Sequence, residues 1–344
     1  MAIMTVTGPI DTTALGITLA HEHLFLDLRN QWVVPADPEE RRLAEQKVGP
    51  ENLAKLRQNP FLLADNLLLD DMELTVAEVT PFQQRGGKTI VDCTSEGICR
   101  APEKLRELSR RTGLQIVAGC GFYTYDTHPP QFESRPVEAV ADRIIQDLTA
   151  GIGQSGIRAG IIGEIGTSSP IRSGEMLCLR AAARAQRRTG TAIQVHTYPW
   201  GREGLPAVRC LLKEGVDPAK IAICHVDVDL QAPYIRSLLQ LGVYVEFDDF
   251  GKEFSVEGAR SFAGGPFATD RQRVEIIRQL LEEGWEKQIL TTTDVCLKCL
   301  LHAYGGGGYD HLLQSIVPLM RECGISAETV EMFLVKNPAR LMGT

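Results

Sequence analysis

Short apolar segments alternate with amphipathic segments along most of the chain. Eight apolar segments have the length and composition of buried strands; they cover residues 17–26, 89–94, 115–120, 159–166, 192–196, 221–225, 243–247 and 288–292. Segments with helical periodicity, many of which end at a glycine, lie between and after them; they cover residues 74–85, 105–111, 137–150, 175–188, 205–214, 231–241, 271–283, 309–323 and 327–336. This regular alternation predicts an α/β protein with one parallel sheet.

We expect the sheet to close into a (β/α)8 TIM barrel. The alternative is an open doubly wound sheet, which would need a glycine-rich phosphate loop after its first strand, and His21-Glu22-His23 occupies that place. Residues 30–75 are too long for a simple connection, so we expect them to form an insertion with helices over one end of the barrel. Neither a linker nor a low-complexity segment divides the chain, and residues 1–344 are expected to form a single domain.

Composition narrows the classes of function. The 344 residues are 44% hydrophobic and 23% charged, carry a net charge of −8 and contain no apolar stretch of bilayer length. This balance argues against nucleic acid or an anionic membrane as the main partner. The nine cysteines are odd in number and scattered, which is typical of reduced thiols in a cytoplasmic protein.

Histidines and carboxylates gather at the ends of the expected strands. His21 and His23 are one strand repeat apart and share a face, whereas Glu22 points away from it. A helical zincin motif is excluded because Phe25 occupies the position of its second histidine. The later strands end in Glu164, His196, His225 and Asp294. Functional groups in such a barrel project from the carboxyl ends of the strands, so these side chains are expected to meet.

This many ligands point to more than one metal ion. Four of the seven histidines lie at strand ends, together with two carboxylates. A single zinc ion is usually held by three or four protein groups. The set therefore suits two divalent ions about 3.5–4 Å apart, with one carboxylate bridging them and a hydroxide between them.

These residues and their neighbours resemble the ligand set of the phosphotriesterase family, within the amidohydrolase superfamily. The similarity extends over nearly the whole chain, from Gly16–His23 through Ile162–Gly166 to Lys298 and residues 304–309. The best known phosphotriesterases and lactonases use a carbamylated lysine as the bridging ligand. This chain has Glu164 at that position, as in the phosphotriesterase-related branch. A carboxylate offers the same two oxygens without a need for carbon dioxide.

The resemblance implies a role for each ligand. His21, His23 and Asp294 would bind the more buried metal ion, His196 and His225 the more exposed one, and Glu164 would bridge them. Zinc is the expected metal, with manganese, cobalt or iron as alternatives. The bridging hydroxide would attack the substrate, and Asp294 would be the catalytic residue that accepts the released proton. Asp227 and Asp229 are candidates for passing this proton on, but their register leaves that role open.

We therefore predict a hydrolase that cleaves a lactone or another carboxylic ester, with phosphotriester cleavage as a promiscuous side activity. The alternatives are an N-acyl amide or amino-acid hydrolase of the same superfamily, and a barrel that binds a metal or a ligand without catalysis. Loops after the strands carry aromatic and charged residues that suit a small, partly apolar substrate. The candidate substrate-binding residues are Tyr123, Tyr198, Asp249, Lys298 and Tyr304. Relatives are often dimers, which leaves a homodimer open.

Overall fold

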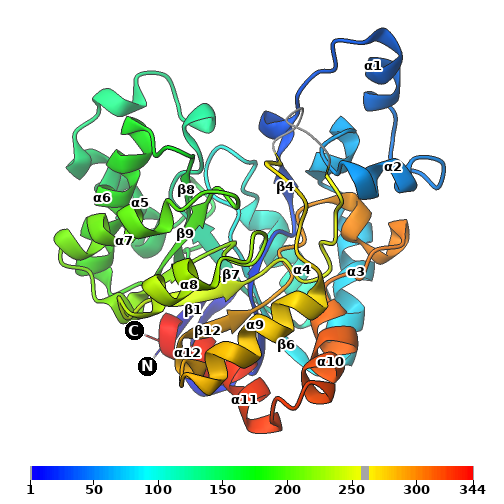
Figure 1. The fold of residues 1–344 in the computed structure, drawn as a ribbon. Coiled ribbons are helices and arrows are strands. Elements are labelled where there is room, and N and C mark those ends of the chain that lie inside the picture. The colour runs from blue at the N-terminus through cyan, green and yellow to red at the C-terminus, as the bar shows by residue number, and fades with distance from the viewer. Residues whose placement is uncertain (1, 257–262, 344) are drawn as a thin grey trace.

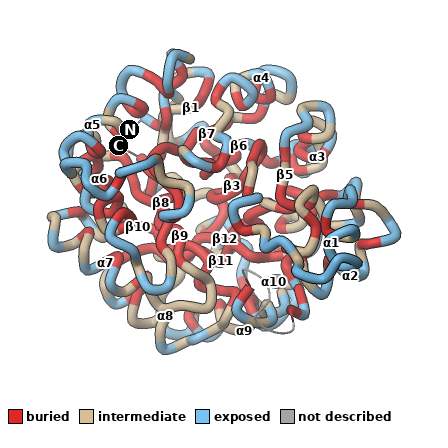
Figure 2. The backbone as a smooth tube through the Cα atoms, turned by 90° about the horizontal axis from the view of Figure 1, so that it is seen from above, coloured by how far each residue is buried: buried red, intermediate tan, exposed pale blue. Residues whose placement is uncertain are grey.

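A computed structural model of the protein describes residues 2–256 and 263–343. Eight parallel strands form one sheet in the order β12-β11-β10-β9-β8-β7-β6-β3, and helices surround it (Figures 1 and 2). The strands are β3 (Ile17–Glu22), β6 (Gly87–Asp92), β7 (Gln115–Cys120), β8 (Ile161–Thr167), β9 (Ile193–Thr197), β10 (Ile221–Ile223), β11 (Tyr244–Phe247) and β12 (Ile289–Thr291). Between the two ends of this sheet, the hydroxyl of Thr292 donates a hydrogen bond to the carbonyl of His21 at 3.2 Å. The predicted (β/α)8 barrel is confirmed.

Amphipathic helices cover the outside of the barrel. They are α3 (Met72–Gln84), α4 (Pro102–Thr112), α5 (Val137–Thr149), α6 (Ser173–Thr189), α7 (Gly204–Lys213), α8 (Ala232–Leu239) and α9 (Asp270–Glu282). Their apolar faces are buried, as Leu105 and Leu108 of α4 show with at most 1% exposure. Gly113 and Gly190 end α4 and α6 in the left-handed conformation, as their sequence positions predict. No helix among the described residues is long and apolar enough to cross a bilayer.

The C-terminal helices are more broken than the periodicity predicts. A π-helical turn over Leu312–Ile316 precedes α10 (Val317–Glu322), and a second over Met332–Lys336 lies between α11 (Ala327–Glu331) and α12 (Asn337–Met342). Pro318 and Pro338 stand near the start of the helix that follows each turn. Proline lacks the N–H that would continue an α-helical ladder, so the helix geometry changes there.

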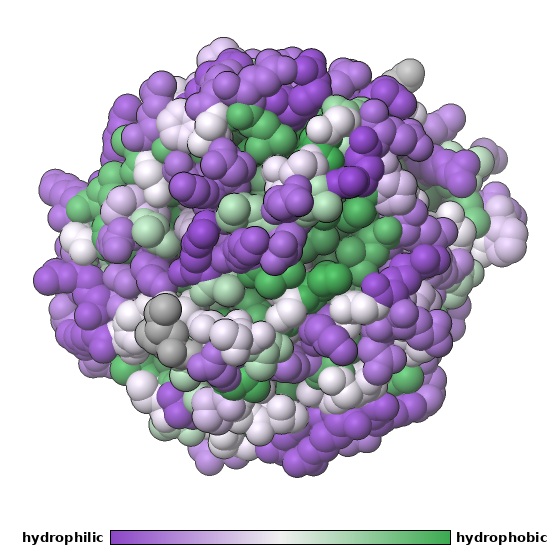
Figure 3. Space-filling model, turned by 90° about the horizontal axis from the view of Figure 1, so that it is seen from below, coloured by the Kyte–Doolittle hydropathy of each residue, from purple (hydrophilic) through white to green (hydrophobic). Residues whose placement is uncertain are grey.

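Inward-facing strand residues fill the barrel below its upper rim. Val117 and Leu290 are fully buried there, and Ile3 and Leu341 pack into the same cluster. Ile3 belongs to a hairpin of β1 (Ala2–Thr5) and β2 (Gly8–Asp11) that the sequence pattern did not predict. Together with α12, this hairpin closes the lower end of the barrel (Figure 1). The surface seen from below carries hydrophobic residues in its middle and hydrophilic residues around them (Figure 3).

The insertion after the first strand lies over one side of the upper end (Figures 1 and 2). It contains α1 (Pro38–Ala44), α2 (Leu53–Gln58) and a 3-10 helix over Ala64–Leu67. The first barrel strand ends at Glu22 rather than at residue 26, because Leu26–Asp27 (β4) pairs antiparallel with Leu68–Leu69 (β5). The insertion thus begins from a small sheet of its own, next to the carboxyl ends of the barrel strands.

Candidate metal centre

The upper ends of five barrel strands bring six side chains together. They are His21 in β3, His23 just after it, Glu164 in β8, His196 in β9, His225 after β10 and Asp294 after β12. Each is buried, with at most 5% of its surface exposed. These are the six residues that the sequence indicates as metal ligands.

Glu164 lies at the centre of this cluster. Its Oε1 is 3.2 Å from His23 Nε2. Its Oε2 faces other imidazoles, at 3.1 Å from His196 Nδ1, 3.5 Å from His225 Nε2 and 3.6 Å from His21 Nε2. The carboxylate of Glu164 therefore lies between His23 on one side and the other three imidazoles on the other.

Asp294 completes the cluster on the side of the first strand. Its Oδ1 is 3.3 Å from His23 Nε2 and 3.8 Å from His21 Nε2. The ligand atoms of His21, His23 and Asp294 lie within 4.8 Å of one another, and so do those of His21, Glu164 and His225. His21 Nε2 and Asp294 Oδ1 are buried without a hydrogen-bond partner among the described residues. A cation would satisfy both atoms, so the residues present fit a metal centre.

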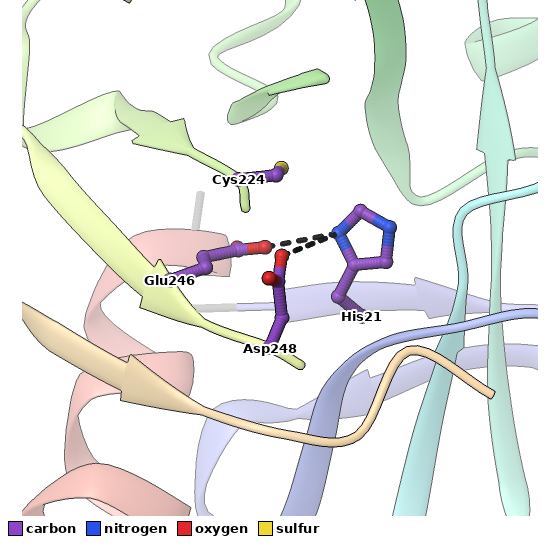
Figure 4. A group of neighbouring side chains, drawn as sticks. All are labelled: His21, Cys224, Glu246 and Asp248. Carbon is purple, nitrogen blue, oxygen red and sulfur yellow. Dashed lines mark hydrogen bonds and ion pairs between the residues drawn. The ribbon is translucent and has the colours of Figure 1, made fainter. Parts of the chain in front are cut away.

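The outer nitrogens of three histidines are held by further side chains. His21 Nδ1 donates to Glu246 at 2.9 Å, and Asp248 lies on the same side of its ring (Figure 4). His23 Nδ1 is 2.9 Å from the Thr94 hydroxyl, and His225 Nδ1 is 3.1 Å from Asp248. Such contacts fix ring orientation and leave Nε2 free to bind a metal. The sequence analysis missed Glu246 and Thr94, although a charged residue within an apolar strand was a usable signal for Glu246.

Electrostatics show that the cluster stabilises positive charge. Burial alone would raise the pKa of Glu164, but the imidazoles, His196 foremost, hold that pKa well below its usual value. Burial would lower the pKa of His23, yet the neighbouring carboxylates of Asp294 and Glu164 raise this pKa to about 9. Burial likewise opposes the rise in the pKa of His225 that Asp248 causes. The carboxylates therefore favour positive charge between them, which a divalent cation supplies as well as protons do.

Lys252, in the loop after β11, contacts the cluster and was missed by the sequence analysis. Its ammonium group pairs with Asp294 Oδ2, and it lies 2.9 Å from Asp249 Oδ1. The side chain is only 4% exposed. Asp294 thus faces the histidines with one oxygen and a buried lysine with the other.

The two acids left open for proton transfer are engaged elsewhere. Asp227 lies 3.0 Å from Arg273 Nε and accepts hydrogen bonds from the amides of Asp248 and Asp249, at 3.3 and 3.2 Å. Asp229 pairs with Arg202 at 2.8 Å. Asp227 therefore supports the loop after β11, and Asp229 supports the loop after β9.

A cavity of about 50 Å³ opens onto the cluster. Its walls are mainly apolar, with Leu28, Phe61, Trp200, Phe254, Phe267 and Leu297, and its polar lining includes Gln31, Tyr123, Asp249 and Lys252. The Tyr123 hydroxyl is 3.3 Å from His196 Nδ1 and accepts a hydrogen bond from Gln31 at 3.1 Å. Of the predicted substrate-binding residues, the structure brings Tyr123 and Asp249 to this cavity.

The other three predicted substrate-binding residues lie elsewhere. Lys298 and Tyr304 line a separate cavity of about 460 Å³ beside the insertion, where Lys298 pairs with Asp65 at 2.7 Å. The loop after β12 turns toward the insertion, which draws both side chains away from the metal centre. Tyr198 is not among the residues that line the first cavity, and it packs against Trp200, which is, with ring centroids 5.6 Å apart.

Comparison with known proteins identifies the family of this chain. The model of the phosphotriesterase family matches residues 1–342. The N-acetyltaurine hydrolase of Danio rerio is 35% identical over 340 residues, which are 98% of this chain and 97% of that protein. A resiniferatoxin-binding protein from Rhodobacter sphaeroides is 38% identical with a TM-score of 0.95, over 99% of this chain and 94% of that one. A mutant PTE-like lactonase from Deinococcus radiodurans is 30% identical with a TM-score of 0.77, over 99% of this chain and 100% of that one. The chain therefore belongs to the phosphotriesterase family, and it is a hydrolase.

Proposed function

We propose that the protein is a binuclear metal hydrolase that cleaves the amide bond of a small N-acyl compound. One observation carries this choice of substrate: Asp249 lines the cavity, and one of its carboxylate oxygens accepts no hydrogen bond from the described residues. Its Oδ1 lies 2.9 Å from the Lys252 ammonium group. Its Oδ2 is 3.9 Å from His225 Nδ1 and is buried without a hydrogen-bond partner among the described residues. An unsatisfied buried oxygen is costly, and the N–H of an amide would satisfy it. A lactone or an ester has no such hydrogen.

The likeness to N-acetyltaurine hydrolases supports the same choice. The relative from Danio rerio is 35% identical and is aligned over nearly its full length.

The proposed centre holds two divalent ions, zinc foremost, with manganese, cobalt or iron as alternatives. His21, His23 and Asp294 would hold one ion, His196 and His225 the other, and Glu164 would contact both. When bound, these ions would polarise the scissile carbonyl and lower the pKa of a water molecule enough for it to act as the nucleophile. Asp294 would take up the proton that is released on attack, while Lys252 pairs with its Oδ2 and thereby fixes the orientation of the carboxylate.

The second candidate is cleavage of a lactone or another carboxylic ester, which the largely apolar cavity and the lactonase relative favour. A barrel that binds a ligand without hydrolysis is the third reading, in line with the resiniferatoxin-binding relative. Turnover rates on an amide, an ester and a lactone of similar structure distinguish these three functions.

The test compares each N-acyl amide with the ester that replaces its N–H by oxygen. Wild type is expected to have the higher kcat/KM for the amide once the intrinsic reactivity of the two bonds is corrected for. Asp249→Asn keeps an oxygen for Lys252 but turns an NH2 toward the cavity, where it cannot accept a hydrogen bond. We expect this variant to lose about 10–100-fold in kcat/KM for the amide and little for the ester.

Asp229→Asn is the matched control, because it removes a carboxylate that pairs with Arg202 outside the cavity. It should leave both substrates unaffected. Equal losses on amide and ester in Asp249→Asn, or a lactone that outpaces every amide in wild type, would contradict the amide assignment.

A further inference from the structure

Glu22 stands between the two histidines of the first strand, and its carboxylate reaches the segment after β12. It is fully buried. Its Oε1 accepts hydrogen bonds from the Thr293 amide at 2.9 Å and from the hydroxyls of Thr292 and Thr293, both at 2.6 Å. Its Oε2 accepts a hydrogen bond from the Val295 amide at 2.6 Å. One carboxylate therefore holds residues 292–295, the segment that carries Asp294.

The backbone of this segment needs such support. Asp294 has φ of 42°, in the left-handed region that residues other than glycine seldom adopt. The amides immediately before and after it, those of Thr293 and Val295, both end on Glu22. Two fixed amides on either side of one residue determine the direction in which its side chain leaves the backbone.

The seam of the barrel, where β3 and β12 lie side by side, is a second reason why the segment that carries Asp294 needs Glu22. In the ranges that the structure describes, no backbone ladder pairs β3 with β12. The hydrogen bonds of Glu22 hold these strand ends together, and the single hydroxyl hydrogen of Thr292 is shared between Glu22 Oε1 at 2.6 Å and the carbonyl of His21 at 3.2 Å. The position of Asp294 relative to His21 and His23 thus depends on side chains across this seam.

We propose that Glu22 is a positioning residue for hydrolysis. It sets Asp294 so that Oδ1 faces His21 and His23 while Oδ2 meets Lys252. This inference rests on the proposed function in one respect, the role of Asp294 as proton acceptor.

Glu22→Gln tests the inference, because it keeps the size of the side chain but replaces one acceptor oxygen by an NH2 group. The backbone amide of either Thr293 or Val295 then loses the oxygen that accepts its hydrogen bond. We expect kcat to fall about 100-fold, the cost of displacing a reacting group by roughly 1 Å, with KM changed less than about twofold. A crystal structure of the zinc-loaded variant should show the Asp294 carboxylate moved away from Lys252.

Glu175→Gln is the matched control. Glu175 is also fully buried, and it accepts hydrogen bonds from the amides of Tyr125, Ser168 and Arg172 at 3.1, 3.0 and 2.7 Å around the start of α6. Both variants should lower the melting temperature by similar amounts, but Glu175→Gln should keep kcat within about twofold of wild type. A purely structural role for Glu22 predicts the same kcat in both variants, and that result would overturn the inference.

The test of Glu22 can fail without the amide assignment failing, and the reverse also holds. The kcat values are measured with whichever amide, ester or lactone wild type hydrolyses best, so an error in the substrate class does not affect the comparison. Should wild type hydrolyse none of them, the crystal structure decides alone. An unmoved Asp294 in Glu22→Gln would refute the positioning role, and a displaced one would support it.

Discussion

Replacement of Glu164 by glutamine is expected to cost most of one metal ion per chain and at least about 100-fold in kcat. The neighbouring imidazoles keep the pKa of Glu164 well below its usual value, so the carboxylate is ionised at neutral pH. Glutamine preserves the shape but removes the charge that offsets two close cations, which is worth several kcal/mol of transition-state stabilisation. Elemental analysis together with kcat on the best substrate measures both effects. Glu164→Ala should be worse, because it leaves no bridge.

Bicarbonate provides an independent check on the same residue. A lysine must react with carbon dioxide before it can bridge two ions, whereas Glu164 is a carboxylate already. Recovery of activity by stripped protein with zinc or manganese, in carbon-dioxide-depleted buffer, should therefore be indifferent to added bicarbonate. A clear acceleration would mean that a lysine supplies the bridge.

Glu175→Gln is the matched control for the metal content of Glu164→Gln. Glu175 is a buried carboxylate outside the cluster, so this variant should retain both metal ions.

Asp294→Asn should retain metal better than it retains turnover. Asparagine can still present an oxygen to the side of His21 and His23, but it cannot take up a proton. Its NH2 group would also face the Lys252 ammonium, where two donors meet. We expect kcat to fall at least about 100-fold, as is usual for loss of a general base, with the metal content nearly unchanged.

Two effects contribute to the loss in Asp294→Asn: the missing proton acceptor and the disturbed contact with Lys252. The variant Lys252→Met separates them. It removes the lysine while keeping the proton acceptor, so it should reduce kcat less than Asp294→Asn does. Parallel loss of metal and activity in Asp294→Asn would instead mean that Asp294 acts chiefly as a structural ligand.

The sequence was sufficient to predict the barrel and where the six ligand-type residues would lie. The reason is topological, because parallel strands of a closed sheet present their carboxyl ends on one face. Once Glu164, His196 and His225 are placed at strand ends, they must lie near His21 and His23 whatever the loops do. Local periodicity and glycine stops provide this information, and both are read within short windows of the chain.

The supporting contacts could not be predicted in the same way. Lys252 reaches Asp294 and Glu246 reaches His21 through loop and strand geometry that joins positions far apart in the chain. The direction of the loop after β12 was equally hidden, since the contact of Lys298 with Asp65 depends on how the insertion packs. The first strand ended early because residues 26 and 27 pair with residues 68 and 69, which no local pattern reveals.

The number of divalent ions per chain tests the central claim most directly. Purified protein, stripped with a chelator and titrated with zinc, should bind close to two ions per chain, and activity should rise with the ions bound. A His21→Ala/His23→Ala variant should lose one ion together with activity. Active wild-type protein that contains no transition metal, or that saturates at a single ion, would contradict the binuclear centre.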